Sequence, residues 1–339
     1  MRRLLLATLC LAAGVAPTTA VGAPYLPPSG KVFHSGLGGY GPGAVGDFTT
    51  QSGKHPAVFQ YFISWQSGEP DLNFFAGLLR KSGAAGSRAM LSVSTSGTGL
   101  TPGAIARGRG DTFLVAMNRI LAEHGQPTYL RLLSEMNNAN NPYSAYDLSG
   151  NSRGRAFSTR EFKRAWRRAA LVLRGGDLST VNSRLRRLGM PPVQSAVTTL
   201  ERPAVALLWV PLTFGNPEIA RNHPKHWWPG SGYVDWVGST WYSPFPAASA
   251  FHRFMNHPLW RTKPFAFSEY GVWGAESPSF VRLFFRFVRS HPRVRLISYY
   301  QSGLVKPEFR LSTHPRSRAE LRRQLSSFRY LGYAPEYRP

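Results

Sequence analysis

The chain has 339 residues, of which 42% are hydrophobic and 17% are charged. This composition supports a folded core and excludes a disordered chain, and the length suits one large domain or two ordinary ones. Lysine and arginine outnumber aspartate and glutamate by 41 to 17, so the net charge is +24 and the surface should attract polyanions.

The N-terminus has the pattern of a secretory signal peptide. Two arginines precede an apolar run from Leu4 to Val15, which is too short to anchor the chain in a bilayer. Small residues suited to cleavage follow at Thr18-Thr19-Ala20; a second site ending at Ala23 would leave a proline directly after the cut. We therefore predict a signal peptide over 1–20, a mature domain over 21–339, and a protein that is secreted or associated with the cell envelope.

The sequence offers little to a metal or a cofactor. Cys10, inside the apolar run, is the only cysteine, so the mature chain has no disulfide and no thiol ligand. His223 and His226 lie three apart without a nearby carboxylate, a spacing more typical of surface residues than of a metal site. No phosphate loop or dinucleotide fingerprint is present. We predict no cofactor, no further transmembrane segment and a monomer.

Apolar runs of strand character alternate with helix-like segments along the chain. The runs are rich in Val, Ile, Leu and Phe, as expected for parallel strands that are covered on both faces. The alternation predicts a single (β/α)8 barrel, with 177–203 as an excursion between the fourth and fifth strands. The predicted strands are 31–34, 57–64, 88–93, 128–134, 205–210, 234–242, 264–268 and 294–300. The predicted helices are 71–81, 111–124, 159–174, 249–256, 277–290 and 316–328.

Basic residues gather in clusters rather than being spread evenly. Their helical spacing is compatible with ordinary solvated helix faces, and also with a surface that holds anionic cell-wall polymers. No pattern for specific nucleic-acid recognition accompanies them. The clusters are Arg153, Arg155, Arg160, Lys163, Arg164, Arg167 and Arg168; Arg184, Arg186 and Arg187; and Arg316, Arg318, Arg322, Arg323 and Arg329.

Two of the predicted strands end in the pair Ser-Glu. The fourth strand runs into Glu135 and the seventh into Glu269, which is followed at once by a turn at Gly271. In a (β/α)8 barrel the active site forms at the carboxyl ends of the strands, so both carboxylates should face one cleft. Paired carboxylates are the machinery of glycoside hydrolysis. Aromatic residues near strand ends could stack on sugar rings: Trp65, Trp209, Trp241, Tyr242 and Tyr300, with His34 as a further sugar contact.

These strand ends resemble glycoside hydrolase family 26, the retaining β-mannanase-like barrels, over about residues 38–302. The similar segments are Gly53-Lys54-His55-Pro56 with Gln60 to Trp65, Arg131-x-x-x-Glu135-Met136-Asn137, Val234 to Tyr242, and Lys263-Pro264 to Ser268-Glu269. Three positions depart from the family pattern: Ser134 stands where histidine is usual, Asn138 where glycine is usual, and Asn140 where tryptophan is usual.

The resemblance implies a role for each matched position. Glu135 is the expected acid/base and Glu269 the expected nucleophile, with Tyr242 hydrogen-bonded to the nucleophile and keeping it ionised. Arg131 supports the pair from below, Trp209 is a sugar platform, and Asn137 belongs to the substrate-binding set. The implied substrate is a β-linked polysaccharide such as β-mannan.

Two other classes of function stay open at this stage. The changed residues around Glu135 are compatible with a catalytically silent carbohydrate-binding protein of the same fold. The basic composition is compatible with an envelope-associated protein whose partner is a polyanion.

Overall fold

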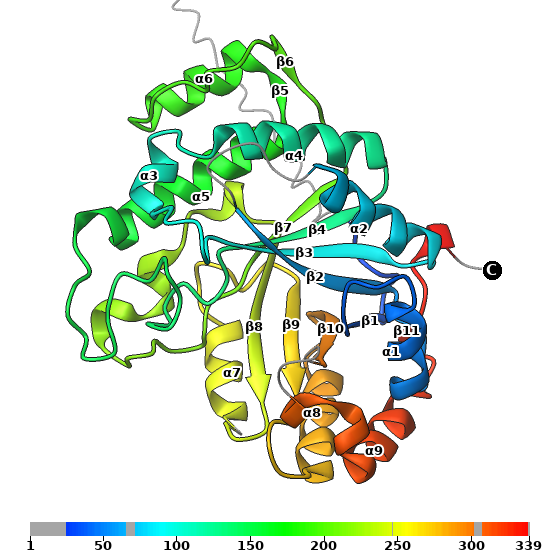
Figure 1. Ribbon diagram of the computed structural model, residues 1–339. Helices are drawn as coiled ribbons and strands as arrows, with labels where there is room; N and C mark the ends of the chain where they lie inside the picture. The colour runs from blue at the N-terminus through cyan, green and yellow to red at the C-terminus, as the bar shows by residue number, and fades with distance from the viewer. Residues whose placement is uncertain (1–24, 66–71, 246, 302–306, 338–339) are drawn as a thin grey trace, which may run out of the picture.

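The computed structural model describes residues 25–65, 72–245, 247–301 and 307–337, so the predicted signal peptide lies outside the described residues. Eight parallel strands follow one another around a barrel, and the last pairs with the first to close it (Figure 1). The predicted (β/α)8 fold is confirmed. The barrel strands are β1 (Val32–Leu37), β2 (Val58–Ser64), β3 (Arg88–Ser94), β4 (Thr128–Leu132), β7 (Val205–Trp209), β8 (Trp236–Tyr242), β9 (Phe265–Gly271) and β10 (Val294–Tyr300).

Helices lie around the outside of the barrel (Figure 1). The predictions for α4 (Asp111–His124) and α5 (Thr159–Arg174) match at both ends, whereas α1 (Ala44–Ser52), α3 (Pro102–Ala106) and α6 (Leu178–Arg187) fall in segments without a predicted helix. The predicted excursion contains α6 and a small antiparallel pair, β5 (Gly176–Asp177) and β6 (Thr199–Leu200). A short strand, β11 (Tyr330–Leu331), pairs with the start of β1. The α-helices are α1 (Ala44–Ser52), α2 (Leu72–Ala84), α3 (Pro102–Ala106), α4 (Asp111–His124), α5 (Thr159–Arg174), α6 (Leu178–Arg187), α7 (Ala248–Met255), α8 (Pro278–Ser290) and α9 (Pro315–Leu325).

The outer core lies between the strands and the helices, and α8 shows how it forms. Ser277 caps the helix by accepting a hydrogen bond from the backbone N–H of Phe280. Phe280, Phe284 and Phe287 then recur at helical spacing and are buried. Phe284 stacks on Tyr270 of β9 with ring centroids 3.8 Å apart. Burial of each such ring stabilises the fold by about 1.5–3 kcal/mol.

The barrel interior changes character along the strands. Side chains two residues apart on a strand point to the same side. On six strands an apolar or aromatic residue is followed two positions later by a polar one, nearer the carboxyl end. We call the second set the polar layer. The pairs are Phe33 and Ser35, Val58 and Gln60, Met90 and Ser92, Tyr129 and Arg131, Ala266 and Ser268, and Leu296 and Ser298.

Hydrogen bonds within the polar layer join strands that are distant in sequence. Ser35 Oγ donates to Ser298 Oγ at 3.1 Å, and the Gln60 amide contacts both Ser92 and Ser298. The Gln60 amide makes the most hydrogen bonds with its oxygen facing Ser92 and Arg131 and its nitrogen facing Ser298 and the carbonyl of Ser268. Buried polar groups that are satisfied in this way form a rigid floor beneath the open end of the barrel.

Candidate active site

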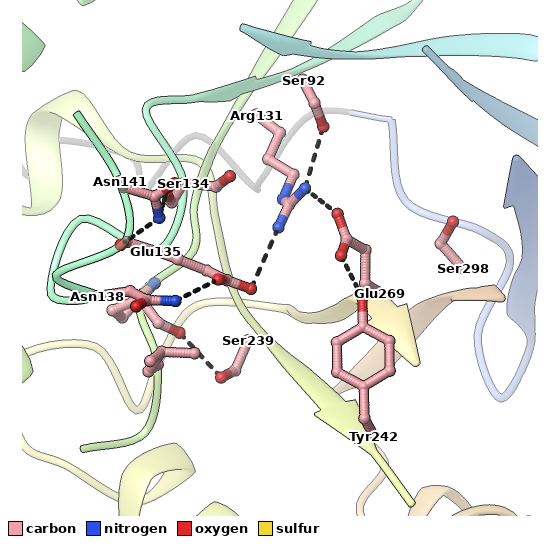
Figure 2. A network of polar contacts seen from close by, with 12 residues as sticks. Ser92, Arg131, Ser134, Glu135, Asn138, Asn141, Ser239, Tyr242, Glu269 and Ser298 are labelled. Atoms are coloured by element: carbon pink, nitrogen blue, oxygen red, sulfur yellow. Dashed lines mark hydrogen bonds and ion pairs between the residues drawn. The ribbon is translucent and has the colours of Figure 1, made fainter. Parts of the chain in front are cut away.

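The first carboxylate of the site stands on an unusual stretch of backbone just after β4. Leu133 has φ of 42° and Glu135 has φ of 52°, left-handed values that cost a non-glycine residue about 1–3 kcal/mol. The turn is held by a hydrogen bond from the Glu135 N–H to the Val210 carbonyl at 2.6 Å. Asn138 N–H donates to the Glu135 carbonyl at 2.9 Å. This geometry directs the Glu135 side chain toward the centre of the site (Figure 2).

The second carboxylate, Glu269, lies within β9 and is 6% exposed. The register between β8 and β9 shifts at Ser239/Thr240, so that Thr240 pairs with Glu269 and Trp241 with Tyr270. Tyr242, at the end of β8, donates its hydroxyl to Glu269 Oε2 at 2.5 Å. Because this tyrosine is only partly buried, the hydrogen bond lies at the boundary between the barrel interior and the cleft.

Arg131 joins the two carboxylates (Figure 2). Its Nη1 donates to Glu269 Oε1 and, at 3.2 Å, is also hydrogen-bonded to Ser92 Oγ of the polar layer. Its Nη2 lies 3.9 Å from Glu135 Oε1. The guanidinium is 2% exposed, and a buried cation is tolerated only where anions and hydrogen bonds compensate it. The two glutamates provide that compensation.

The electrostatics of the site come from burial opposed by these contacts. Burial raises the pKa of the Glu269 carboxyl and the nearby Glu135 adds to the rise, while Arg131 and the Tyr242 hydroxyl oppose it. Burial, together with the two carboxylates, raises the pKa of the Tyr242 hydroxyl well above its ordinary value. Tyr242 therefore stays protonated and acts as a hydrogen-bond donor.

An amide beside Glu135 fixes the position of its carboxylate. Asn138 Nδ2 donates to Glu135 Oε2 at 3.2 Å, and Asn138 Oδ1 accepts from Asn216 Nδ2 at 3.1 Å. This position departs from the family pattern, yet its side chain contacts the carboxylate directly. Ser134 contributes through its backbone, since its carbonyl accepts from the Tyr143 hydroxyl at 2.6 Å.

Two adjoining hollows share Glu135, Asn138, Tyr242 and Trp273 and together form one cleft. The larger, of about 620 Å³, has both carboxylates and Arg131 in its floor, and the smaller, of about 500 Å³, extends past Glu135. Aromatic side chains line the walls on both sides. The aromatic wall residues are Tyr40, Phe62, Tyr143, Tyr242, Trp273, Tyr300 and Phe309 in the larger hollow, and Phe214, Trp241, Phe245 and Phe251 in the smaller one, which also shares Tyr242 and Trp273.

Some of the aromatic residues predicted to bind sugar do not lie on the cleft surface. Trp209 is fully buried on the outer side of the barrel, where its ring packs against Trp228, Phe254 and Trp260. It therefore offers no face to a sugar, and the predicted platform is wrong. Its place in the strand explains this, because β7 is covered on both faces and an apolar run does not reveal which way a tryptophan points.

Three more predicted contacts are also buried. Trp65 is fully buried, stacks on Phe113 of α4 and donates to the Gly110 carbonyl at 3.3 Å. His34 is fully buried and stacks on Phe48, and burial lowers its pKa to about 3, so it stays neutral. Neither belongs to the cleft lining. Asn137 is buried as well, and its amide fixes Leu212, a wall residue of the smaller hollow, through hydrogen bonds of 2.9 and 3.0 Å.

The remaining predicted contacts lie at the cleft. Tyr300 lines the larger hollow. Trp241 borders the smaller one but is only 1% exposed, and its indole N–H donates to the Phe245 carbonyl at 2.9 Å. Sequence reasoning missed Trp273, which is 40% exposed and contacts both Tyr242 and Phe309. The feature of the sequence that could have indicated a cleft position for Trp273 is its place two residues beyond the end of β9.

The described residues contain no group of three or more histidine, cysteine, aspartate or glutamate side chains placed to hold a metal ion. In the same part of the chain, no helix is long and apolar enough to cross a membrane.

Comparisons with known proteins place this fold. No protein-family model matches the sequence, and no curated protein matches it. Solved structures do match. A double mutant of the Cellulomonas fimi endo-β-1,4-mannanase superposes with a TM-score of 0.59 at 16% identity, over 91% of this chain and 73% of that one. A family 26 protein from Muricauda sp. gives 0.59 at 14% identity, over 89% and 92% of the two chains.

A family 26 β-mannanase from Bacteroides ovatus superposes with a TM-score of 0.56 at 14% identity, over 90% of each chain. Agreement over most of both chains at such low identity concerns the fold. The chain therefore has the fold of the family 26 glycoside hydrolases, as its motifs implied.

Proposed function

We propose that this protein is a retaining glycoside hydrolase that cleaves a β-linked polysaccharide, β-mannan or a related β-glycan. The observation that carries the proposal is the contact of two cleft carboxylates, Glu135 and Glu269, with one buried guanidinium. Side chains from β4 and β9 meet there at the open end of a barrel, where this fold places its catalytic groups.

The two glutamates have different surroundings, which supports different roles for them. Glu269 is held at both oxygens, by Arg131 at Oε1 and by Tyr242 at Oε2. Burial raises the pKa of Glu269, and the donors to both oxygens oppose that rise, stabilise the ionised form and fix its orientation, as a nucleophile requires. Glu135 is more exposed, at 20%, and receives one amide hydrogen bond, so its carboxyl can exchange protons with substrate and water.

The reaction then runs in two steps. Glu135 gives its proton to the glycosidic oxygen as Glu269 attacks the anomeric carbon, which breaks the C–O bond and forms a glycosyl ester. Glu135, now ionised, takes a proton from a water molecule as that water attacks the same carbon. The ester bond to Glu269 breaks, the sugar leaves with its original configuration, and both carboxyls return to their starting state.

The lining of the cleft supports an uncharged glycan as substrate. Among the described lining residues of the two hollows, Arg131 is the only lysine or arginine, and the carboxylates already compensate it. An acidic polysaccharide would meet Glu135, Glu269 and Glu218 there without a free cation. Exposed rings such as Trp273 and Phe214 suit the apolar faces of neutral sugars. We further propose that the protein acts outside the cell, after removal of the predicted signal peptide.

The test is a panel of β-mannan, mixed-linked β-glucan and β-1,3-xylan, assayed with the wild type, Glu135→Ala and Glu269→Ala. We expect the wild type to release new reducing ends from at least one glycan. The rate of release should be lower by about 10²–10⁴-fold or more in the variants. NMR of the first product should show the β anomer. Undiminished turnover by Glu269→Ala would refute the assignment, and glycan binding without hydrolysis by the wild type would identify a silent binder.

A further inference from the structure

A second site lies away from the cleft, on the outer surface formed by α5 and the loop after α6. There Arg160, Lys163, Arg164 and Arg167 surround a hollow of about 300 Å³ that is closed by Leu188 and Gly189. We call this the basic pocket. Its cations come from one basic cluster of the sequence, and its wall directly follows the second cluster, so the fold brings the two together.

Two of the four pocket cations, Arg164 and Arg167, are held in place by hydrogen bonds to backbone carbonyls. Arg164 Nη2 donates to the Gly189 carbonyl, which fixes the loop after α6 against α5. Arg168, fully buried beneath, anchors the same loop through the Pro191 carbonyl at 2.8 Å. Arg167 Nε donates to the Pro229 carbonyl at 2.8 Å, and its guanidinium lies 5.5 Å from the centre of the Tyr233 ring.

The positive charge of the pocket is poorly compensated. Glu161 pairs with Arg164 at 3.0 Å and offsets one of the four cations. In the described part of the chain, no carboxylate lies within ion-pair distance of Arg160, Lys163 or Arg167. Burial, with Arg167 beside it, lowers the pKa of the Lys163 amine, so its charge is disfavoured until an anion arrives. Carbonyl oxygens orient the arginines but do not neutralise them.

We propose that the basic pocket binds phosphate groups of an anionic polymer with a phosphodiester backbone of the polyol-phosphate kind. Arginine forks and a lysine amine are the groups that recognise phosphate oxygens. A polymer fits better than a free ion because Arg184, Arg186 and Arg187 form the last turn of α6 and lead directly to the pocket wall. One chain can contact both α6 and the pocket. The basic pocket shares no residue with the cleft, so this site is independent of hydrolysis.

The experiment measures binding of a fluorescent poly(glycerol phosphate) oligomer to the full protein by anisotropy over a series of salt concentrations. The test variant is Arg160→Ala/Lys163→Ala, which removes two pocket cations that hold no other described element. The control is Arg253→Ala/Arg261→Ala, which removes the same charge from exposed positions on and after α7. This control matters because a net charge of +24 gives every polyanion some affinity.

We expect Kd to rise about tenfold in the pocket variant and less than about twofold in the control, near physiological salt. The dependence of log Kd on log salt should also become shallower by about one for each lost phosphate contact. Inorganic phosphate should compete only weakly. An equal rise of Kd in both variants would show that the polymer is attracted by the overall charge of the surface and would overturn the proposal. Competition by inorganic phosphate that is as effective, per phosphate group, as competition by the oligomer would also overturn it. The same holds if single-stranded DNA of equal charge binds more tightly than the oligomer in a pocket-dependent way.

Discussion

Removal of the Tyr242 hydroxyl tests the proposed chemistry most directly. Tyr242→Phe keeps the ring, which packs against Trp273, Tyr300 and Phe309, so the wall of the cleft should stand. What is lost is one hydrogen bond to Glu269 Oε2. That bond favours the ionised carboxylate, so its loss raises the pKa of Glu269.

The magnitude follows from the nature of the bond. A hydrogen bond to a charged acceptor contributes about 1.5–3 kcal/mol. This corresponds to a factor of about 10–150 in the equilibrium between the ionised and protonated carboxyl. A nucleophile must be ionised, so the acid limb of kcat/KM against pH should move to higher pH. At a fixed pH on that limb, kcat/KM should fall by about the same factor.

The assay is the pH profile of kcat/KM on the best glycan of the panel. Tyr40→Phe is the matched control, because Tyr40 also lines the cleft but donates its hydroxyl to the Phe62 carbonyl and not to a glutamate. Its profile should overlie that of the wild type. An acid limb that stays in place in Tyr242→Phe, or moves to lower pH, refutes the role assigned to this hydroxyl.

Three further predictions concern the acid/base, the aromatic residues and the base of the barrel. Glu135→Ala should lower kcat/KM by about 10²–10⁴-fold on polysaccharide but much less on aryl glycosides whose leaving group needs no proton. An equal fall in kcat/KM on both substrates contradicts the acid role. Trp209→Ala should lower the free energy of unfolding by about 3–5 kcal/mol and leave KM unchanged, whereas Trp273→Ala should raise KM with little effect on urea unfolding. Glu336→Gln should destabilise by about 1.5–3 kcal/mol at neutral pH by breaking its 2.6 Å ion pair with Arg88, as thermal unfolding will show. Burial raises the pKa of Glu336, but its hydrogen bonds, chiefly those with Arg88, outweigh burial and hold the pKa below its ordinary value. The stability difference should therefore be complete above the unfolded-state pKa of about 4.3 and be lost as pH falls through the lower pKa of the folded state.

The barrel and its two glutamates could be predicted from the sequence because both depend on local pattern. Eight apolar runs alternating with amphipathic helices leave few other folds, and carboxylates after strands must lie at one end of a parallel barrel. The sequence does not predict α6, because its apolar positions, Leu178, Val181 and Leu185, are few among polar residues and arginines. Here the helix is stabilised by tertiary packing more than by propensity.

Side-chain direction was the harder part of the site. The strand-end positions of Trp209 and Trp65 predict side chains in the cleft, but each side chain points outward into helix packing. The better signal was the period of two within the strands. Phe33 precedes Ser35 and Leu296 precedes Ser298, so parity marks which side chains enter the barrel on strands of regular register. On β9 it fails, because the register shift lets Glu269 reach the interior although it has the parity of the outer residue Phe267. Applied to β4, the same parity places Arg131 inside, above Tyr129.

The position of Glu135 does not depend on the side chain that stands at position 134 in place of the usual histidine. Glu135 is positioned by left-handed backbone at Leu133 and Glu135 itself, and by the hydrogen bond to Val210. None of these depends on the side chain of Ser134. Arg131, held by Glu269, also lies 3.9 Å from Glu135 and attracts its carboxylate whenever that group is ionised. The pair and the guanidinium thus form one coupled unit, because Arg131 contacts both carboxylates and a change at one of the three positions alters the electrostatics of the other two. Substitutions at the three positions should therefore be strongly non-additive, which distinguishes a built catalytic pair from two glutamates that happen to share a cleft.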